Sequence, residues 1–563
     1  MKIFEQLAFR ILALLFVANL TVSPPLLYAG NERAQTSPRF PEILLPSFPE
    51  KQINIVDYGA VGDGKTMNTE TIAKAISACA AAGGGKVVIP AGIWLTGPIQ
   101  LQSNIDLHVA RGALVIFSPN RRDYPLIETW YEGRPEYRCM SPIFGENLEN
   151  IAITGEGVFD GSGEVWRPVK KFKLTAMQWK ELVASGGVVD QKGSTWWPSA
   201  AAMTGADDIE NLRKSTKPPA REEFEKLRDF LRPVLLQLSR CNKILLDGPT
   251  FQNSPAWNLH PLMSENITIR NVTVRNPWYS QNGDGLDLES CRNVAVYNCY
   301  FDVGDDAICL KSGRDDAGSQ RFIPTENVQI YDCIVYHGHG GFVVGSEMSG
   351  GVRNIEVRDC TFIGTDTGLR FKSTRGRGGV VENIYIKRIL MKDIPAAAIT
   401  FNLYYSGQAP IVEPGQASSF DAEEPVPVSA ATPQFKNIFI SDVTARGAAQ
   451  AVEMLGLPEM PLHGIELKNI SISAQKGLLG MNADHIKLTN VEIIPQSGPA
   501  LAFHNSTNVA VEAAHLPTGL ETFLSLSGKK TAGINLSKAG VSEVKKHVKL
   551  SPEVNATVLH WGN

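Results

Sequence analysis

Apolar and polar positions alternate along most of the chain, in short runs that repeat. In each run a turn residue, most often asparagine, precedes an apolar-x-apolar phrase. The clear copies are NIAI (150–153), NITI (266–269), NVAV (293–296), NVQI (327–330), NIEV (354–357), NIYI (383–386) and NIFI (437–440), and the weaker ones are GIEL (464–467), HIKL (485–488) and NVAV (508–511). Alternation with a period of two residues predicts β-strands, and the turn residues mark where the strands end.

The spacing of these phrases predicts how the strands assemble. Successive phrases that start at residues 266, 293, 327, 354 and 383 are 27 to 34 residues apart. Strand-rich repeats of this length, without the helical pattern of ankyrin or tetratricopeptide units, favour a right-handed parallel β-helix whose coils stack only on their neighbours. The asparagines would stack at the corners, and the apolar positions would line one core. A β-propeller is the alternative, but the repeats lack its larger four-strand unit.

Three segments depart from the repeat. TETIAKAISACAAAGGG (69–85) has helical periodicity with Ile72 and Ile76 on one face, and we expect it to cap the exposed end of the solenoid. Residues 165–235 include a charged, helix-like run, and residues 402–434 are rich in proline, alanine and serine. We interpret both as insertions that emerge from the solenoid and shape a binding site.

The first residues have the pattern of an export signal. A positively charged start precedes ILALLFVANLTV (11–22), which is too short for a comfortable transmembrane helix, and we expect cleavage after Ala29. The resulting organisation is a signal peptide (1–29), an N-terminal linker (30–50) and a single β-helix domain (51–563). We therefore expect export to the periplasm or the extracellular space, with no membrane span.

Charge and cysteine content exclude several classes of protein. The 563 residues carry a formal net charge of −4, or about −5 without residues 1–29, and this balance does not suggest a nucleic-acid partner. An anionic partner would need a local cluster of lysine and arginine. Five of the eight cysteines fall in successive strand-like segments without CxxC spacing: Cys291, Cys299, Cys309, Cys333 and Cys360. We expect buried thiols there rather than a metal site, and no cofactor.

One segment matches the P-loop motif without the surrounding elements that the motif requires. GAVGDGKT (59–66) satisfies the P-loop pattern, with a strand-like segment before it and a helix soon after it. A nucleotide-binding P-loop needs an alternating βα core behind the motif, whereas this chain continues into strand repeats. We interpret the segment as a glycine-rich turn.

Polar groups that a plain β-helix does not need occur in four consecutive repeats. They are Asn282, Asp284 and Asp287 in NGDGLDLES, Asp305 and Asp306 in GDDA, His337 and His339 in HGHGG, and Arg370 and Lys372 in GLRFKSTRGRGG. Stacked coils bring equivalent positions to within about 4.8 Å per turn, so we expect these groups to converge on one lateral face. The adjacent Asp305 and Asp306 would normally point to opposite sides of a strand, so a bend after Gly304 is needed to present both.

Three carboxyls beside two cations and a histidine suit glycoside hydrolysis. One carboxyl would protonate the leaving oxygen and another would activate water, and inverting enzymes hold such a pair about 6.5–9.5 Å apart. Crowding of like charges would raise the pKa of the carboxyl that acts as the acid. Arg370 and Lys372 would bind a substrate carboxylate, which points to an acidic sugar.

These stretches resemble the polygalacturonases of glycoside hydrolase family 28. The family signatures NTDG, (G/Q)DD, GHG and RIK correspond in order to residues 282–285, 304–306, 338–340 and 370–372. The resemblance runs from about residue 53 to 450 and includes the opening DYGAVGDG. It implies a parallel β-helix that cleaves α-1,4-galacturonosyl bonds of pectin.

The resemblance also assigns roles. It implies that Asp306 is the general acid, that Asp284 and Asp305 hold and deprotonate the water, and that His339 supports the acid. Arg370 and Lys372 would grip galacturonate. Weaker candidates for substrate binding are Asn282, Tyr405, His260 and Trp257, and Asp287 and Glu289 would hold turns. Gly283 stands where the family has threonine, and we expect the glycine to loosen that turn. Phe371 stands where the family has isoleucine.

Segments such as KSGRDDAG and KSTRGRGG resemble the exo-acting branch of the family. The function expected is therefore an exported exo-polygalacturonase acting by inversion. Three alternatives stay open: a galacturonidase acting on rhamnogalacturonan branches, a pectate lyase, which usually needs Ca²⁺, and a non-catalytic polysaccharide-binding β-helix. The sequence does not predict the oligomeric state.

Overall fold

The computed structural model of the protein describes residues 39–562 except 215–219, 316–317, 319, 321–322, 406–423, 514 and 538–540. Residues 39–563 form one compact unit. The predicted signal peptide, residues 30–38 of the predicted linker and most of the segment 402–434 lie outside the described residues.

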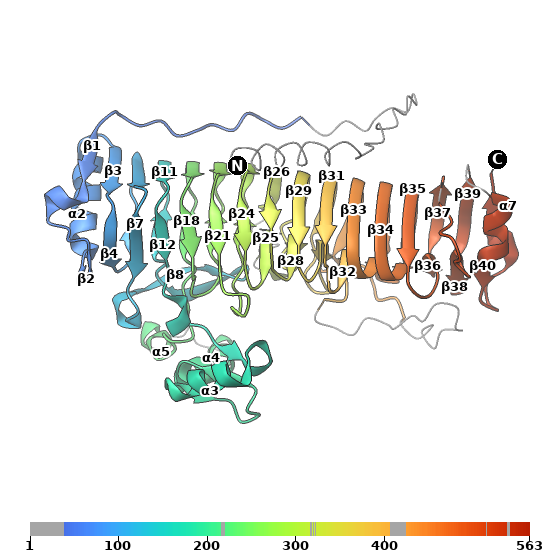
Figure 1. The fold of residues 1–563 in the computed structure, drawn as a ribbon, viewed down its shortest axis with the longest axis horizontal. Coiled ribbons are helices and arrows are strands. Elements are labelled where there is room, and N and C mark those ends of the chain that lie inside the picture. Colours follow the sequence, from blue (N-terminus) through green and yellow to red (C-terminus); the bar gives the residue numbers. More distant parts are fainter. Residues whose placement is uncertain are drawn as a thin grey trace, which may run out of the picture. The chain divides into compact units, whose positions relative to one another are not determined.

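The unit is a right-handed parallel β-helix with three faces, confirming the predicted fold (Figure 1). The coils run in the order face 1, face 2, face 3, although the first coil has no strand on face 3 and the last coils have none on face 2 within the described residues. Equivalent strands of successive coils pair in parallel. The strands of face 1 are β1 (Gln52–Asn54), β3 (Gly85–Ile89), β6 (Ile105–Val109), β11 (Glu149–Gly155), β17 (Asn242–Asp247), β20 (Glu265–Arg270), β23 (Arg292–Tyr297), β26 (Thr325–Tyr331), β37 (Thr507–Glu512), β39 (Ala532–Ser537) and β41 (Leu559–Trp561). This parallel pairing excludes the propeller alternative.

Faces 2 and 3 are built in the same way. The strands of face 2 are β2 (Asp63–Met67), β4 (Gly92–Thr96), β7 (Ala113–Phe117), β12 (Val158–Asp160), β18 (Thr250–Gln252), β21 (Thr273–Arg275), β24 (Tyr300–Asp302) and β27 (Ile334–Val335). The strands of face 3 are β5 (Ile99–Gln100), β10 (Ile143–Glu146), β16 (Leu236–Ser239), β19 (Leu259–Leu262), β22 (Leu286–Glu289), β25 (Asp306–Lys311), β28 (Gly340–Gly345), β30 (Leu369–Lys372), β32 (Ala397–Asn402), β36 (Leu501–His504), β38 (Leu524–Ser527) and β40 (Val548–Leu550). Longer strands turn the corners without a break: β29 (Val352–Ile363), β31 (Val380–Lys392), β33 (Gln434–Leu455), β34 (Leu462–Met481) and β35 (Ala483–Pro495).

The repeated phrase explains this stacking. Its apolar positions align in register and are buried, as in the ladder formed by Ile267, Val294, Val328, Ile355, Ile384 and Ile438. Its asparagines form the predicted corner ladder. Asn293, Asn327 and Asn354 all have a positive φ, which asparagine tolerates better than most residues. The amide of Asn327 donates to Asn293 of the preceding coil, and the amide of Asn354 donates to Asn327.

The predicted cap is α2 (Thr69–Ala81), whose Ile72, Ile76 and Cys79 are buried. Residues 63–66 of the P-loop match lie in strand β2, which pairs with β4, so they do not start a phosphate-binding helix. All eight cysteines are free and buried, and these include the five that we expected to be buried thiols. A short helix α7 (Val541–Val544) lies near the other end. Within the described residues no helix is long and apolar enough to cross a membrane.

The insertion at 165–235 is present and is joined by a hairpin that the sequence did not reveal. The hairpin consists of β8 (Leu126–Tyr131) and β9 (Arg134–Cys139). The insertion contains β13 (Val169–Lys170), α3 (Ala176–Ala184), β14 (Val188–Val189), β15 (Thr195–Trp197), α4 (Ala200–Arg213) and α5 (Arg221–Glu225) (Figure 1). Hairpin and insertion share a small core of their own, made by Tyr124, Leu126, Cys139, Trp166, Ile209, Phe224, Leu227 and Leu231.

Candidate active site

The four predicted polar stretches do converge, on the outer side of face 3. Asp284 lies just before β22, Asp305 and Asp306 lie at the start of β25, and His339 lies just before β28. Arg370 and Lys372 lie on β30. Because β22, β25, β28 and β30 pair with one another in this order, the turn before each strand sits beside the turn before the next.

Glycines beside these carboxyls allow the turns to pack closely. A Cβ at Gly283 would lie 1.9 Å from Ser280 Oγ, and a Cβ at Gly304 would lie 2.4 Å from the same atom. Both distances are too short for any side chain. The expectation that Gly283 loosens its turn is therefore wrong, because the glycine is what lets the 277–280 loop pack against the turn that carries Asp284.

The three candidate carboxyls form one cluster. One carboxylate oxygen each from Asp284, Asp305 and Asp306 lie within 4.8 Å of one another, so the bend at Gly304 does present both neighbours to one side. This spacing is shorter than the roughly 6.5–9.5 Å that we expected for an inverting pair. It suits a water molecule held between two of the carboxylates, since two hydrogen bonds of about 2.8 Å span up to about 5.5 Å.

Asp306 is bound by both predicted substrate-binding cations. Lys372 Nζ lies 2.6 Å from Asp306 Oδ2, and Arg370 Nη1 lies 3.2 Å from Asp306 Oδ1. Burial alone would raise the pKa of Asp306, but the charges of Lys372, Arg370 and Lys311 outweigh it and hold the pKa well below the usual aspartate range. In the substrate-free protein Asp306 is therefore a carboxylate.

Asp284 carries the raised pKa instead. The side chain is buried, and burial raises its pKa well above the usual value, with further contributions from the charges of Asp305 and Asp287. Its Oδ1 makes no hydrogen bond within the described residues. We expected the raised pKa at the carboxyl that acts as the acid, which the family resemblance placed at Asp306. That expectation is wrong for the substrate-free protein, because Asp306 has two adjacent cations and Asp284 has none in contact among the residues that the structure describes.

His339 is held by Asp305. Its Nδ1 lies 3.1 Å from Asp305 Oδ1, and its backbone N–H donates to the Asp305 carbonyl. The hydrogen bond to Asp305 raises the pKa of His339, against the effect of its burial. Burial raises the pKa of Asp305, but the hydrogen bond from His339 leaves it lowered overall, so the two groups stabilise each other's charges.

A layer of buried charges that the sequence did not reveal lies beside the cluster. Lys311 Nζ lies 3.0 Å from Glu347 Oε2 and 3.5 Å from Asp287 Oδ1. Asp287 and Glu289 were expected to hold turns, but both lie within β22 and are completely buried. The one sequence signal for this layer is Lys311, at the end of the apolar run AICLK (307–311). A lysine at that position is more simply interpreted as the solvated end of a strand.

Trp257 and His260 are not open to substrate. His260 is completely buried and its Nε2 lies 3.0 Å from Glu289 Oε2. Trp257 is 2% exposed, and it packs against Tyr131 of the hairpin with Lys311 Nζ 4.8 Å from its ring centre. Because neither side chain reaches solvent, the expectation that they bind substrate is not supported, and both support the layer beneath the site.

Tyr405 does lie at the cluster. The ring centre is 4.9 Å from Lys372 Nζ and 5.8 Å from Arg370 Cζ, distances at which an aromatic face attracts a cation. Arg370, Lys372 and Tyr405 line a cavity of about 370 Å³ that continues past β32 toward Glu453 and Lys476. The later coils of face 3 thus offer an open continuation of the site.

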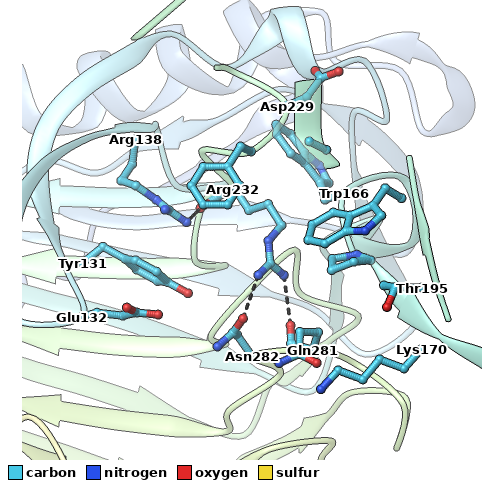
Figure 2. Close-up of a pocket in the computed structure, with 14 residues that line it drawn as sticks. Tyr131, Glu132, Arg138, Trp166, Lys170, Thr195, Asp229, Arg232, Gln281 and Asn282 are labelled. Atoms are coloured by element: carbon cyan, nitrogen blue, oxygen red, sulfur yellow. Dashed lines mark hydrogen bonds between the residues drawn. The ribbon is translucent and has the colours of Figure 1, made fainter. Parts of the chain in front are cut away.

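A second cavity, of about 320 Å³, adjoins the cluster on the side of the earlier coils (Figure 2). Its walls come from the hairpin, the insertion and the loop before Asp284. Arg232, from the end of the insertion, donates to Asn282 Oδ1 at 2.8 Å and to the Gln281 carbonyl at 3.0 Å. The insertion therefore holds the predicted binding residue Asn282 in place. Asn282 lies two residues before Asp284, a candidate catalytic carboxyl. We call this cavity the end pocket.

The insertion also contributes a lysine, Lys173, whose charge interacts with the carboxyl cluster. The charges of Asp305 and Asp366 act on Lys173, whose ammonium lies 6.0 Å from the Trp278 ring centre. Burial lowers the pKa of Lys173, and the charge of Asp305 opposes that effect. No motif marked this lysine, because it lies in the insertion rather than in the repeat.

A parallel β-helix with clustered carboxyls and cations on one face defines a carbohydrate-cleaving enzyme of the β-helix class. The particular family follows from sequence comparison. Residues 168–497 match the family described as "Glycosyl hydrolases family 28", and residues 52–109 match "Rhamnogalacturonase A/epimerase, pectate lyase-like". The chain belongs to family 28 and is a glycoside hydrolase of the polygalacturonase family.

Individual relatives agree with this assignment. The chain is 29% identical over 428 residues to a probable polygalacturonase of Vitis vinifera, with 74% of each chain covered. It is 29% identical over 417 residues to an exo-poly-α-D-galacturonosidase of Dickeya chrysanthemi, covering 72% of this chain and 64% of that enzyme. The solved exopolygalacturonase of Thermotoga maritima is 30% identical, with a TM-score of 0.65 and coverage of 80% and 94%. The family 28 exopolygalacturonase of Yersinia enterocolitica, 22% identical with a TM-score of 0.64 and coverage of 82% and 78%, shows the fold alone.

Proposed function

We propose that this protein is a polygalacturonase that hydrolyses α-1,4-galacturonosyl bonds of pectin from a chain end, with inversion. The observation that carries the proposal is the cluster of Asp284, Asp305 and Asp306, with Arg370 and Lys372 bound to one of its members. A family 28 hydrolase with two cations beside its acid fits a substrate whose own carboxylate must be bound.

Asp284 and Asp305 hold the attacking water between them. The water forms a bond to the anomeric carbon and loses a proton to one of these carboxylates, while Asp306 donates its proton to the departing glycosidic oxygen. The C–O bond to the leaving sugar breaks as the new one forms. Attack from the face opposite the leaving group gives inversion.

Substrate binding places the proton where it is needed. The carboxylate of galacturonate competes with Asp306 for Lys372 and Arg370, and loss of those contacts raises the pKa of Asp306. Hydrolysis requires a protonated Asp306 and an ionised carboxylate beside the water, and a raised pKa of Asp306 favours the first of these states.

The walls of the end pocket support the proposal of action at a chain end. The tip of the β8–β9 hairpin reaches the segment after β25, where Arg314 N–H donates to the Gly133 carbonyl at 3.2 Å and Arg314 also pairs with Glu132. The hairpin thus crosses the outer side of face 3 on one side of the cluster, and the insertion lines the same end pocket. A polysaccharide that enters from the later coils would meet this wall with its terminal sugars.

Incubation of the purified protein with polygalacturonic acid, with products separated over time, tests this proposal. Release of one short product from the earliest times, and its loss in Asp306→Asn with the fold intact, is the expected result. A ladder of oligomers would contradict end-wise attack, and an unsaturated, ultraviolet-absorbing product would indicate a lyase. Unchanged activity in Asp306→Asn would contradict the whole mechanism.

A second candidate is a galacturonidase that acts on rhamnogalacturonan branches. It keeps the Arg370 and Lys372 contacts, and the match of residues 52–109 to a rhamnogalacturonase-like family favours it. Cleavage of rhamnogalacturonan fragments without cleavage of polygalacturonic acid would identify it. In either case we propose that residues 51–563 are one catalytic domain and that the protein is exported through residues 1–29.

A further inference from the structure

The corner ladder of asparagines on face 1 is interrupted in two consecutive coils. Asn437 is followed in register by Gly464, then by His485, and then by Asn508. These are the two weak copies of the repeated phrase, GIEL and HIKL. His485 keeps the left-handed backbone of the asparagines, with φ of +53°.

Three metal-binding side chains gather at this interruption. His463 pairs in register with Asp484 of the next coil, and His485 follows Asp484 directly. The Nδ1 atoms of His463 and His485 lie 3.0 Å and 2.7 Å from the same oxygen, Asp484 Oδ2. Gly464 contributes no side chain between the two coils, and the two imidazole rings lie 4.9 Å apart.

The carboxylate is oriented from behind. Asp484 Oδ1 accepts hydrogen bonds from Thr507 Oγ1 at 2.6 Å and from Asn508 Nδ2 at 2.9 Å, both in the following coil. Fixing a carboxylate through its second oxygen is how outer partners orient a metal ligand.

We propose that His463, Asp484 and His485 bind a divalent transition-metal ion, with Zn²⁺ as the best match. Two imidazoles and one carboxylate are a ligand set for Zn²⁺ and related ions rather than for Ca²⁺ or Mg²⁺. Ligands on one tetrahedral ion stand about 3.3 Å apart when the bonds are about 2.0 Å, so the observed 2.7 and 3.0 Å need only a small expansion. Solvent supplies the remaining ligand, because both histidines are partly exposed.

The bound ion would join two coils of the solenoid, β34 and β35, far along the chain from the catalytic cluster. The proposal does not depend on the substrate of the enzyme. It also differs from the sequence-based expectation of no metal site, which considered the cysteines. The histidines and Asp484 belong to different repeats, and only the stacking of coils brings them together.

Calorimetric titration of the chelator-treated full-length protein with Zn²⁺ alone, near neutral pH, tests the proposal. We expect one equivalent to bind, with thermal unfolding shifted upward by about 2–3 °C at saturating metal. The double variant His463→Gln, His485→Gln should lose this equivalent and the shift, while the control His547→Gln, His560→Gln keeps both. Thr507→Val should weaken Zn²⁺ binding about tenfold, because Asp484 Oδ1 then loses one of the two hydrogen bonds that orient it.

Two results would overturn the proposal. One is the absence of measurable Zn²⁺ binding to the wild-type protein. The other is an equivalent that persists with unchanged affinity in the double histidine variant, which would place the ion elsewhere, for instance at Asp284, Asp305 and Asp306. Circular dichroism of both double variants without metal checks that they fold alike.

Discussion

Lys372 Nζ lies 2.6 Å from Asp306 Oδ2, so in the substrate-free protein the cation that we propose to bind the substrate neutralises the carboxyl that we propose as the acid. Under the proposed function, these two residues couple recognition of the substrate to protonation of the acid. A sugar that brings its own carboxylate can displace Asp306 from Lys372, whereas a neutral or methyl-esterified sugar cannot. Specificity for an acidic substrate then arises in the chemical step as well as in binding.

Replacement of Lys372 by methionine should uncouple these functions. The variant loses a contact to the substrate carboxylate, and the pKa of Asp306 rises in the free enzyme because its nearest positive charge is gone. We expect kcat/KM on polygalacturonate to fall by about 10³-fold or more. The pKa of the acid in the pH profile of kcat/KM should move upward. Lys549→Met, an exposed lysine, is the control, and an unshifted profile in Lys372→Met would contradict the coupling.

The pairing of His339 with Asp305 predicts a pH-dependent contribution to stability. The hydrogen bond raises the pKa of His339 above its unfolded value. A raised histidine pKa stabilises the fold fully below the unfolded pKa, and the contribution disappears as pH rises through the folded pKa. His339→Asn should therefore lower the free energy of unfolding by on the order of 1 kcal/mol at about pH 5 and by little at about pH 9. The partial exposure of the ring reduces the effect at the lower pH.

Thermal or urea unfolding of wild type and His339→Asn at both pH values measures this difference. His337→Asn is a matched control, because His337 also pairs with an aspartate, Asp302 at 2.8 Å, but is more exposed. An equal cost of His339→Asn at acid and alkaline pH would show that the histidine is held by packing and not by its charge.

Gly283→Thr, which restores the residue found in the family signature, should be harmful here. The new Cβ would lie 1.9 Å from Ser280 Oγ and 2.7 Å from Ser280 Cβ. We expect a loss of about 1–3 kcal/mol in the free energy of unfolding and a displaced Asp284. Ser280→Gly in the same chain should recover most of it, and unfolding of both single variants and the double variant measures the coupling. Full stability of Gly283→Thr alone would mean that the loop moves freely.

The buried pair of Lys311 and Glu347 should be costly to break. Burial raises the pKa of Glu347, but the charges of Lys311, Lys372 and Arg377 lower it to about 2, so both partners are charged. Lys311→Met leaves Glu347 and Asp287 without their shared cation, and we expect a loss of about 3–5 kcal/mol. Adding Glu347→Gln should restore part of it. Thermal unfolding of the single and double variants measures this, and additive losses would contradict the pairing.

The fold was predictable because one phrase repeats. The phrase fixes which residues face the core and where the corners lie, and the stacking of coils then brings Asp284, Asp306 and Arg370 together although they are far apart in sequence. The packing at Gly283 was not predictable, because it depends on Ser280 of a loop with no repeat signal. The charge state of Asp306 was also missed, since it depends on distances of about 3 Å that a motif does not specify.

The walls of the site were the least predictable part. The insertion was visible as a break in the repeat, but the β8–β9 hairpin was not, because its alternating strands look like one more coil. Its role becomes clear only from contacts such as that between Gly133 and Arg314. The metal-binding candidates His463 and His485 were hidden for a related reason, because they appear in sequence only as weak copies of the phrase.

Shortening the hairpin tests whether it blocks one end of the site. Residues 129–136 include the tip and Tyr131, which line the end pocket, whereas Leu126 and Cys139 at its base belong to the shared core with Trp166. Replacing 129–136 with Asn-Gly, a two-residue turn suited to a hairpin, keeps that core. With the wall lowered, a polysaccharide can extend past the cluster in both directions, so we expect mixed oligomers from the earliest times on polygalacturonate. The control is a variant in which residues 190–193, in the loop before β15, are replaced with the same Asn-Gly turn. If the shortened protein still releases one short product, the end of the site is closed by the insertion itself and not by the hairpin.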